Sequence, residues 1–368
     1  MNSRFIGAIF LILGTCIGGS MLALPMATAQ EGVTRTIIIM LGAWAMMMIG
    51  AFALLRVNLK LPENSNLISM SKETLGKTGA VITWVITLAL LYTLLAAYIS
   101  SGEDLLGILF EQFKIQTPMW LNAVLFTVCL GFIVYKGIRL VDYVNRGLMS
   151  SKLLICIILI LLLIPFTAIP NLSFRHLQGN GSAITCITAF GYACIIPSIR
   201  SYLSSDTKKL YWAIFLGGLI PLIFYLAWIF VVQATIPTAT DLSAMYSNTH
   251  PLKAMVLALA NHVNNRGINI LTNLFTSLCV LTSFLGVALS LADFLADGMR
   301  LKKQTNNLLI VGLALAPPLA IVLLWPAIFL RALNYAGILC LALLFVIPLL
   351  MLLSTMVQKH KWSEIIME

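Results

Sequence analysis

Ten apolar stretches, each close to the 20 residues that an α-helix needs to cross a bilayer, set what this chain can fold into. They lie near 5–29, 34–56, 79–101, 117–136, 148–169, 182–203, 209–235, 268–292, 305–325 and 329–356. The 368 residues are 60% hydrophobic and only 10% charged, which is too little charge to cover a soluble protein of this size. We therefore predict an all-α polytopic membrane protein with one transmembrane domain over 1–368, and a short surface or re-entrant helix at 252–263.

The basic residues predict an orientation. When the N-terminus is placed in the cytoplasm, most of the 23 Lys and Arg fall in the loops on the cytoplasmic side. The outside loops hold only Arg35, Lys114, Arg175, Lys253, Arg266 and Arg331. This bias predicts that both termini are cytoplasmic. It also explains the net charge of +10 without a nucleic-acid partner.

The sequence contains no motif that is typical of an enzyme active site or a metal site. The seven cysteines lie in apolar segments without a C-x-x-C pair, and the four histidines lack metal-ligand spacing. We find no nucleophile elbow, no phosphate loop and no H-E-x-x-H motif. The sequence predicts a protein that is not an enzyme and needs no cofactor or metal.

The first apolar stretch contains LGTCIGGSMLALP (13–25), which should not form an unbroken helix. Glycines let the backbone unwind and let a ligand approach it closely. An unwound segment survives in a membrane only where it is buried in protein or lines a cavity. Its freed N–H groups suit a carboxylate, and its freed carbonyls suit a cation. The alternative is close helix packing through small residues.

The sixth stretch is interrupted as well. It contains ITAFGYACIIPSIRSYL (187–203), in which Gly191 and Pro197 flank the middle. Proline removes a backbone donor and bends or breaks a helix. If the chain consists of two five-helix halves, interruptions in the first and sixth of ten spans occupy corresponding positions; this symmetry rests on helix order, since the halves show no residue-level repeat. Such a pair is the sequence pointer to a secondary transporter with inverted repeats.

Three stretches resemble the hydroxy and aromatic amino acid permeases of the amino acid–polyamine–organocation superfamily, with the bacterial tyrosine-specific permeases nearest. They are GTCIGGSMLALP (14–25), FGYACIIPSI (190–199) and LTSFLGVALSLADFLADG (281–298), and the last is the most specific. The resemblance implies a LeuT-type fold, with inverted repeats at roughly 1–170 and 180–356 and with helices 1 and 6 broken.

The same resemblance implies import of an aromatic amino acid, tyrosine foremost, by proton symport across the bacterial inner membrane. A serine or threonine transporter and a sodium-coupled transporter are alternatives on the same fold. Two departures from the family pattern motivate a further alternative, a membrane sensor that binds an amino acid without moving it. Ala193 stands where the family often has histidine, and the chain ends soon after the tenth span. The sequence does not fix the oligomeric state.

Substrate-binding residues are expected at both breaks and on the third span. The full set is Thr15, Cys16, Gly18, Gly19, Ser20, Tyr92, Tyr98, Phe190, Gly191 and Tyr192. We expect N–H groups around Gly18–Ser20 to bind the carboxylate, and carbonyls at Thr15, Cys16, Phe190 and Gly191 to bind the ammonium. Aromatic residues would line the pocket for the side chain. Interfacial anchoring is the alternative for Tyr98.

Ion coupling is expected at Lys152, Thr282, Ser283 and Asp293. The resemblance implies that a fifth-helix lysine replaces a sodium ion between helices one and eight, with Thr282 and Ser283 opposite. A lysine that extends to the membrane surface is the alternative. Asp293 and Asp297 are four residues apart and share a helix face. They could form a gating or proton site, and a solvated structural pair is the alternative.

Overall fold

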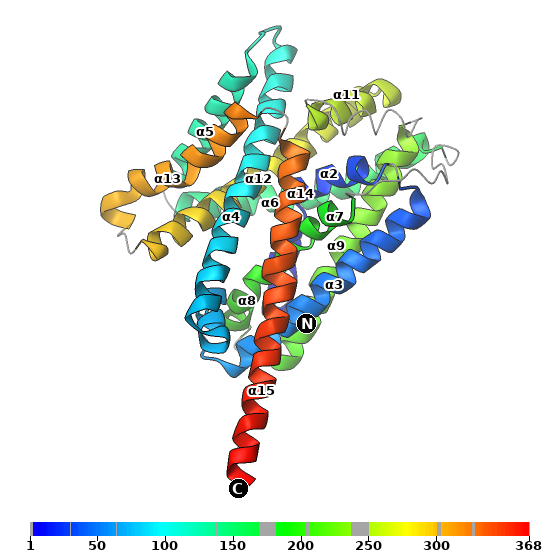
Figure 1. Ribbon diagram of the computed structural model, residues 1–368. Helices are drawn as coiled ribbons and strands as arrows, with labels where there is room; N and C mark the ends of the chain where they lie inside the picture. The colour runs from blue at the N-terminus through cyan, green and yellow to red at the C-terminus, as the bar shows by residue number, and fades with distance from the viewer. Residues whose placement is uncertain are drawn as a thin grey trace.

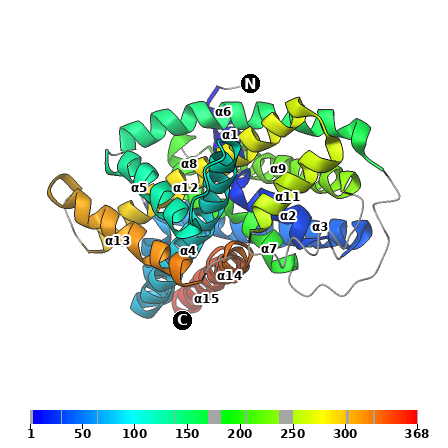
Figure 2. The same ribbon diagram turned by 90° about the horizontal axis from the view of Figure 1, so that it is seen from above.

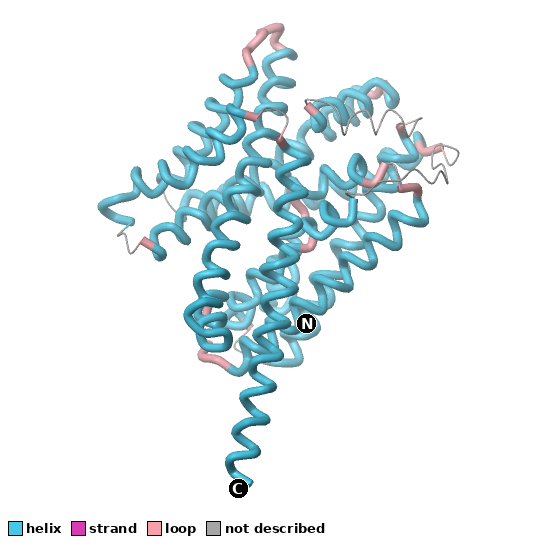
Figure 3. The backbone as a smooth tube through the Cα atoms, in the orientation of Figure 1, coloured by secondary structure: helices cyan, strands magenta, loops and turns pink. Residues whose placement is uncertain are grey.

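The computed structural model describes residues 3–29, 31–63, 65–136, 138–168, 182–203, 206–236, 250–299, 303–325 and 328–367. Within these ranges all regular structure is helical, and Figure 3 shows helices joined by short loops. This agrees with the all-α class that the sequence predicts.

The helices follow one another along the chain (Figure 1). They are α1 Ser3–Cys16, α2 Gly19–Ala27, α3 Val33–Lys60, α4 Leu67–Gln112, α5 Met119–Tyr135, α6 Ile138–Leu163, α7 Ser182–Ala189, α8 Ile196–Tyr202, α9 Thr207–Thr235, α11 Pro251–Val263, α12 Arg266–Gly298, α13 Lys303–Leu324, α14 Phe329–Leu341 and α15 Ile347–Met367. Three short segments of other helix types are η1 Ile164–Phe166, η3 Gly191–Ile195 and η4 Ala342–Val346.

The described residues contain the expected membrane segments. Eight helices or helix runs are long and apolar enough to cross a bilayer, and the bent pair α1–α2 makes a ninth. The apolar helix α5 has 17 residues and occupies the remaining predicted segment. The stretch at 252–263 forms α11, a helix of 13 residues that precedes α12.

Both predicted interruptions are present. The axes of α1 and α2 differ by 54°, with Ile17 and Gly18 between them. In the sixth segment, α7 ends at Ala189, a 3₁₀ turn follows over Gly191–Ile195, and α8 begins before Pro197. The proline lies in the first turn of α8, where its missing N–H costs little.

The third segment is longer than the predicted 79–101. Helix α4 has 46 residues, begins at a cap in which Asn66 accepts the N–H of Ser69, and bends at Gly76. Gly76 has φ +78°, a conformation that glycine adopts readily and other residues do not. The far end carries Glu103 and Asp104, both buried, which are too polar to be counted in an apolar stretch.

The two breaks meet in the middle of the helical body. Helix α1 packs on α9 and η3, α2 packs on α7, α9 and α12, and α12 packs on α6 and α4. Seen from above, α1, α2 and α12 lie between α6 and α14 (Figure 2). Helix α11 lies at the end of the molecule opposite to the C-terminus (Figure 1).

Candidate functional site

Gly18 and Gly19 let two other helices reach the backbone at the first break. A Cβ atom at Gly18 would lie 2.4 Å from Ser283 Oγ of α12, and one at Gly19 would lie 2.6 Å from Tyr98 Cε1 of α4. Gly18 has an extended backbone with φ −156°, which any residue can adopt. Close approach, rather than backbone conformation, therefore explains the Gly18–Gly19 pair.

At the first break, the N-terminus of α2 is hydrogen-bonded by a side chain from another helix. The N–H of Gly19, the first residue of α2, donates to Ser283 Oγ at 2.9 Å. The first N–H groups of any helix lack partners within that helix. Every residue from Gly19 to Met26 is buried, so this N-terminus is enclosed by protein.

Lys152 of α6 lies fully buried against the same break. Its Nζ donates to the Ile17 carbonyl and to Thr282 Oγ1, the latter at 3.1 Å. The Thr282 hydroxyl in turn donates to the Leu278 carbonyl at 2.8 Å, which leaves its oxygen free to accept from the ammonium. The C-terminal end of α1 carries partial negative charge and favours a cation there. Lys152 therefore joins the first break to α12.

The second break is lined by aromatic side chains. Phe190 and Tyr192 are both fully buried. The ring of Phe190 meets Tyr225 edge-on with centroids 5.3 Å apart, and the Tyr225 hydroxyl donates to the Ala189 carbonyl at 2.8 Å. Tyr225 satisfies a carbonyl at the end of α7, where the helix stops.

Sequence reasoning missed Tyr225 because it lies inside the long apolar middle of α9. A tyrosine in mid-span was the available signal, since a buried hydroxyl needs a hydrogen-bond partner. It also missed Cys340 of α14, whose Sγ lies 3.5 Å from where a Cβ of Gly191 would be.

Two predicted residues lie away from the breaks. The Tyr92 hydroxyl donates to the Leu313 carbonyl of α13 at 2.8 Å, on the outer side of α4. Asp293 is half-buried on α12, ten residues beyond Ser283, which is about 15 Å along a helix. Asp297 is exposed.

The two sides of the breaks differ in exposure. On the α2 and α7 side, most residues are buried, including Ser20 and Thr188. On the other side, Thr15 in the last turn of α1 and Cys194 in η3 are both exposed. The Thr15 hydroxyl bonds the Ile12 carbonyl of its own helix at 2.8 Å.

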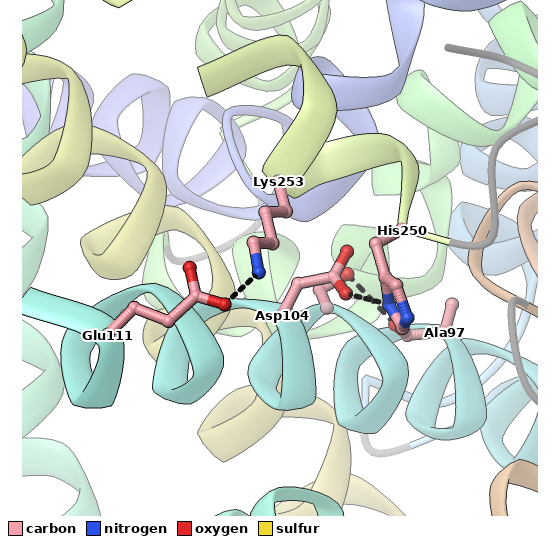
Figure 4. Close-up of polar contacts among 6 residues, drawn as sticks. Ala97, Asp104, Glu111, His250 and Lys253 are labelled. Carbon is pink, nitrogen blue, oxygen red and sulfur yellow. Dashed lines mark hydrogen bonds and ion pairs between the residues drawn. The ribbon is translucent and has the colours of Figure 1, made fainter. Parts of the chain in front are cut away.

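Helix α11 covers the buried side and is tied to α4 by two polar contacts (Figure 4). His250 Nδ1 lies 2.6 Å from Asp104 Oδ1, and Lys253 Nζ forms an ion pair with Glu111 Oε1. The hydrogen bond to the Asp104 carboxylate raises the pKa of His250 above the ordinary 6.5. Lys253 lies on α11 and His250 caps its start, while both carboxylates lie on α4; His250 carries a charge when it is protonated.

A helical body whose first and sixth segments break side by side has the arrangement of the LeuT-type membrane fold. The match to a solved transporter structure supports this fold. A structure of MhsT in complex with L-phenylalanine superposes with a TM-score of 0.60 at 14% identity, covering 95% of this chain and 98% of that one.

The chain belongs to the tryptophan/tyrosine permease family, whose model matches residues 1–365. Members of this family are transporters and not enzymes. Tyrosine-specific transport system 2 of Haemophilus influenzae is 29% identical over 355 residues, which are 95% of this chain and 87% of that protein. Glutamine transporter 2 of Aliivibrio fischeri is 30% identical over 370 residues, covering 99% and 92%.

Proposed function

We propose that this protein is a secondary active importer of an aromatic amino acid, tyrosine foremost, driven by protons through alternating access. One observation carries the proposal. Lys152 places a buried ammonium between the Ile17 carbonyl at the first break and Thr282 Oγ1 on α12. A titratable cation in this position can gain or lose a proton as the two elements move apart.

The physical basis is a link that depends on charge. An ammonium donates strongly to both oxygens, whereas a neutral amine is a weaker donor with one proton fewer. Protonated Lys152 therefore holds α1 against α12, and loss of the proton loosens the contact. A coupling ion shifts the balance between two conformations only as far as it binds one of them better.

The substrate would bind at the breaks. The N–H groups of Gly18, Gly19 and Ser20 are proposed for its carboxylate, and carbonyls near Cys16 and Gly191 for its ammonium. The rings of Tyr98, Phe190 and Tyr192 are proposed as walls around an aromatic side chain. Support for aromatic substrates comes from relatives named as tyrosine-specific transport systems.

The glutamine transporter is similar to this chain to the same degree, so the choice of amino acid is settled by competition experiments. The sensor hypothesis has less support, because the relatives that match nearly the whole chain are named as transporters. A sensor predicts binding without flux, which the same experiments reveal.

The proposed location is the bacterial inner membrane with both termini in the cytoplasm. Lys208 and Lys209 lie in the first turn of α9, and Lys136 caps the end of α5; the proposed topology puts all three on the cytoplasmic side. The bias of basic residues toward these loops supports this orientation. Arg175 belongs to the residues outside the described part.

Uptake of labelled tyrosine into proteoliposomes tests the proposal. Proton and sodium gradients are imposed separately, and unlabelled tryptophan, phenylalanine and glutamine compete. We expect accumulation under the proton gradient, blocked by aromatic competitors, and its loss in Lys152→Met. The exposed Lys136→Met variant serves as the matched control. Accumulation under sodium alone, or unimpaired proton-driven uptake in Lys152→Met, contradicts proton coupling through Lys152.

A further inference from the structure

The hydroxyl of Ser283 accepts a hydrogen bond from a backbone N–H that the substrate would also need. Its oxygen accepts the Gly19 N–H at 2.9 Å, and Gly19 is the first residue of α2. Helix N-termini present unpaired N–H groups and positive partial charge, which favour an anion. Under the proposed function, this N–H is among those that receive the amino acid's carboxylate.

The contact between α12 and the break depends on the bare Cα of Gly18. A Cβ atom there would lie 2.4 Å from Ser283 Oγ, so a larger residue would push the hydroxyl away. Gly19 itself is buried. A buried N–H without a partner costs free energy, and the Ser283 hydroxyl removes that cost when no substrate is bound.

We propose that Ser283 is a positioning residue that holds the place of the substrate's carboxylate. In the empty protein it pairs with the Gly19 N–H, and the amino acid displaces it on binding. This inference rests on the proposed function. A carboxylate forms a charge-assisted hydrogen bond that is about twice as strong as the bond to a neutral hydroxyl, so the exchange favours the substrate.

Ser283 is the neighbour in the chain of Thr282, which accepts from the buried Lys152 ammonium. Thr282, which accepts from Lys152 Nζ at 3.1 Å, precedes Ser283 in α12. The residue proposed to yield to the substrate's carboxylate and the residue that accepts from the Lys152 ammonium are therefore neighbours in the chain. Movement of Ser283 on substrate binding therefore acts on the turn of α12 whose Thr282 hydroxyl accepts from Lys152 of α6.

Binding of tyrosine and of tyramine, which lacks the carboxylate, to purified protein tests the inference. We expect Ser283→Ala to bind tyrosine roughly three- to tenfold more tightly, because no internal bond must be broken, and to leave tyramine binding unchanged. The control is Ser290→Ala on the same helix, where the exposed hydroxyl bonds the Gly286 carbonyl.

Weaker or unchanged tyrosine binding in Ser283→Ala overturns the inference, as does an equal gain for tyramine. Hydrogen exchange at Gly19, followed by NMR of the empty protein with ¹⁵N-glycine, tests the contact without any ligand. We expect several-fold faster exchange in Ser283→Ala, and unchanged exchange also overturns the inference. A wild-type protein that shows the Ser283-dependent protection but binds no amino acid contradicts the proposed function instead, and the displacement step with it.

Discussion

His250 Nδ1 lies 2.6 Å from Asp104 Oδ1, which fastens the start of α11 to the outer part of α4. The Asp104 side chain is 3% exposed and the His250 side chain is 23% exposed, so the contact is largely shielded from water. Glu103 of α4 and Lys253 of α11 are the other charged groups that act on His250. Helix α11 also rests on α2, α9 and α12, so this pair helps to hold a cover over the first break.

The His250–Asp104 pair should make the attachment of α11 dependent on pH. Because the pKa of His250 is raised, the ion pair is complete below about pH 6.5 and is lost as the pH rises through the raised pKa. We expect α11 amides to exchange hydrogen faster above that pKa, after correction for the intrinsic rate. Exchange measured by mass spectrometry between pH 5.5 and 8.5 checks this.

Replacement of the imidazole tests the same pair at constant pH. His250→Gln should weaken the protection of α11 by roughly fivefold, which corresponds to about 1 kcal/mol for a partly exposed charge-assisted bond. His262→Gln is the control, because His262 is exposed near the other end of α11. Equal effects of the two variants, or protection independent of pH, would show that the pair does not fasten α11.

Thr282 should be needed as an acceptor rather than for its shape. Thr282→Val keeps the branched shape but leaves the buried Lys152 ammonium with one bond fewer, at a cost of about 1.5–3 kcal/mol. We expect a lower thermal midpoint and reduced proton-driven uptake. Thr282→Ser, which keeps the hydroxyl, should retain most of both. Similar behaviour of the two variants would assign Thr282 a packing role only.

Gly19 should not tolerate a side chain. In Gly19→Ala the new Cβ would lie 2.6 Å from Tyr98 Cε1, and we expect overpacking to cost about 1–3 kcal/mol and to abolish uptake. Gly286→Ala on α12 is the control, because no atom lies within 4 Å of its added Cβ. Denaturation of both variants in detergent gives the comparison. A Gly19→Ala protein as stable and active as Gly286→Ala would contradict the close approach of Tyr98.

Cys194 should report access to the second break. Among the described cysteines only Cys129 and Cys194 are exposed, so in a Cys129→Ser protein a membrane-impermeant maleimide should label Cys194. We expect a bound aromatic amino acid to slow the labelling severalfold by covering η3. Cys194→Ser in the same background is the control. Labelling that is unaffected by saturating tyrosine would separate Cys194 from the substrate path.

The apolar runs and the breaks could be read from the sequence because both have local causes. A bilayer of fixed thickness and a helix rise of 1.5 Å per residue set the length of each span. Glycine and proline mark the interruptions in the sequence itself: Gly18 and Gly191 lie where the helices stop, and Pro197 lies in the first turn of the helix that follows. The stretch at 252–263 is too short to span a bilayer, and it forms the 13-residue helix α11 as expected.

The partners at the site were decided by tertiary structure, since they come from helices far apart in the chain. Tyr92 and Tyr98 are six residues apart on α4, a rotation of about 240° around the helix, and only packing shows that Tyr98 faces α2 while Tyr92 faces α13. Lys152 could have extended to the membrane surface, yet α6 lies where its ammonium meets Ile17 and Thr282. Local sequence determines where a helix runs and where it breaks, whereas the side chains that meet at the break depend on how the helices rotate and pack.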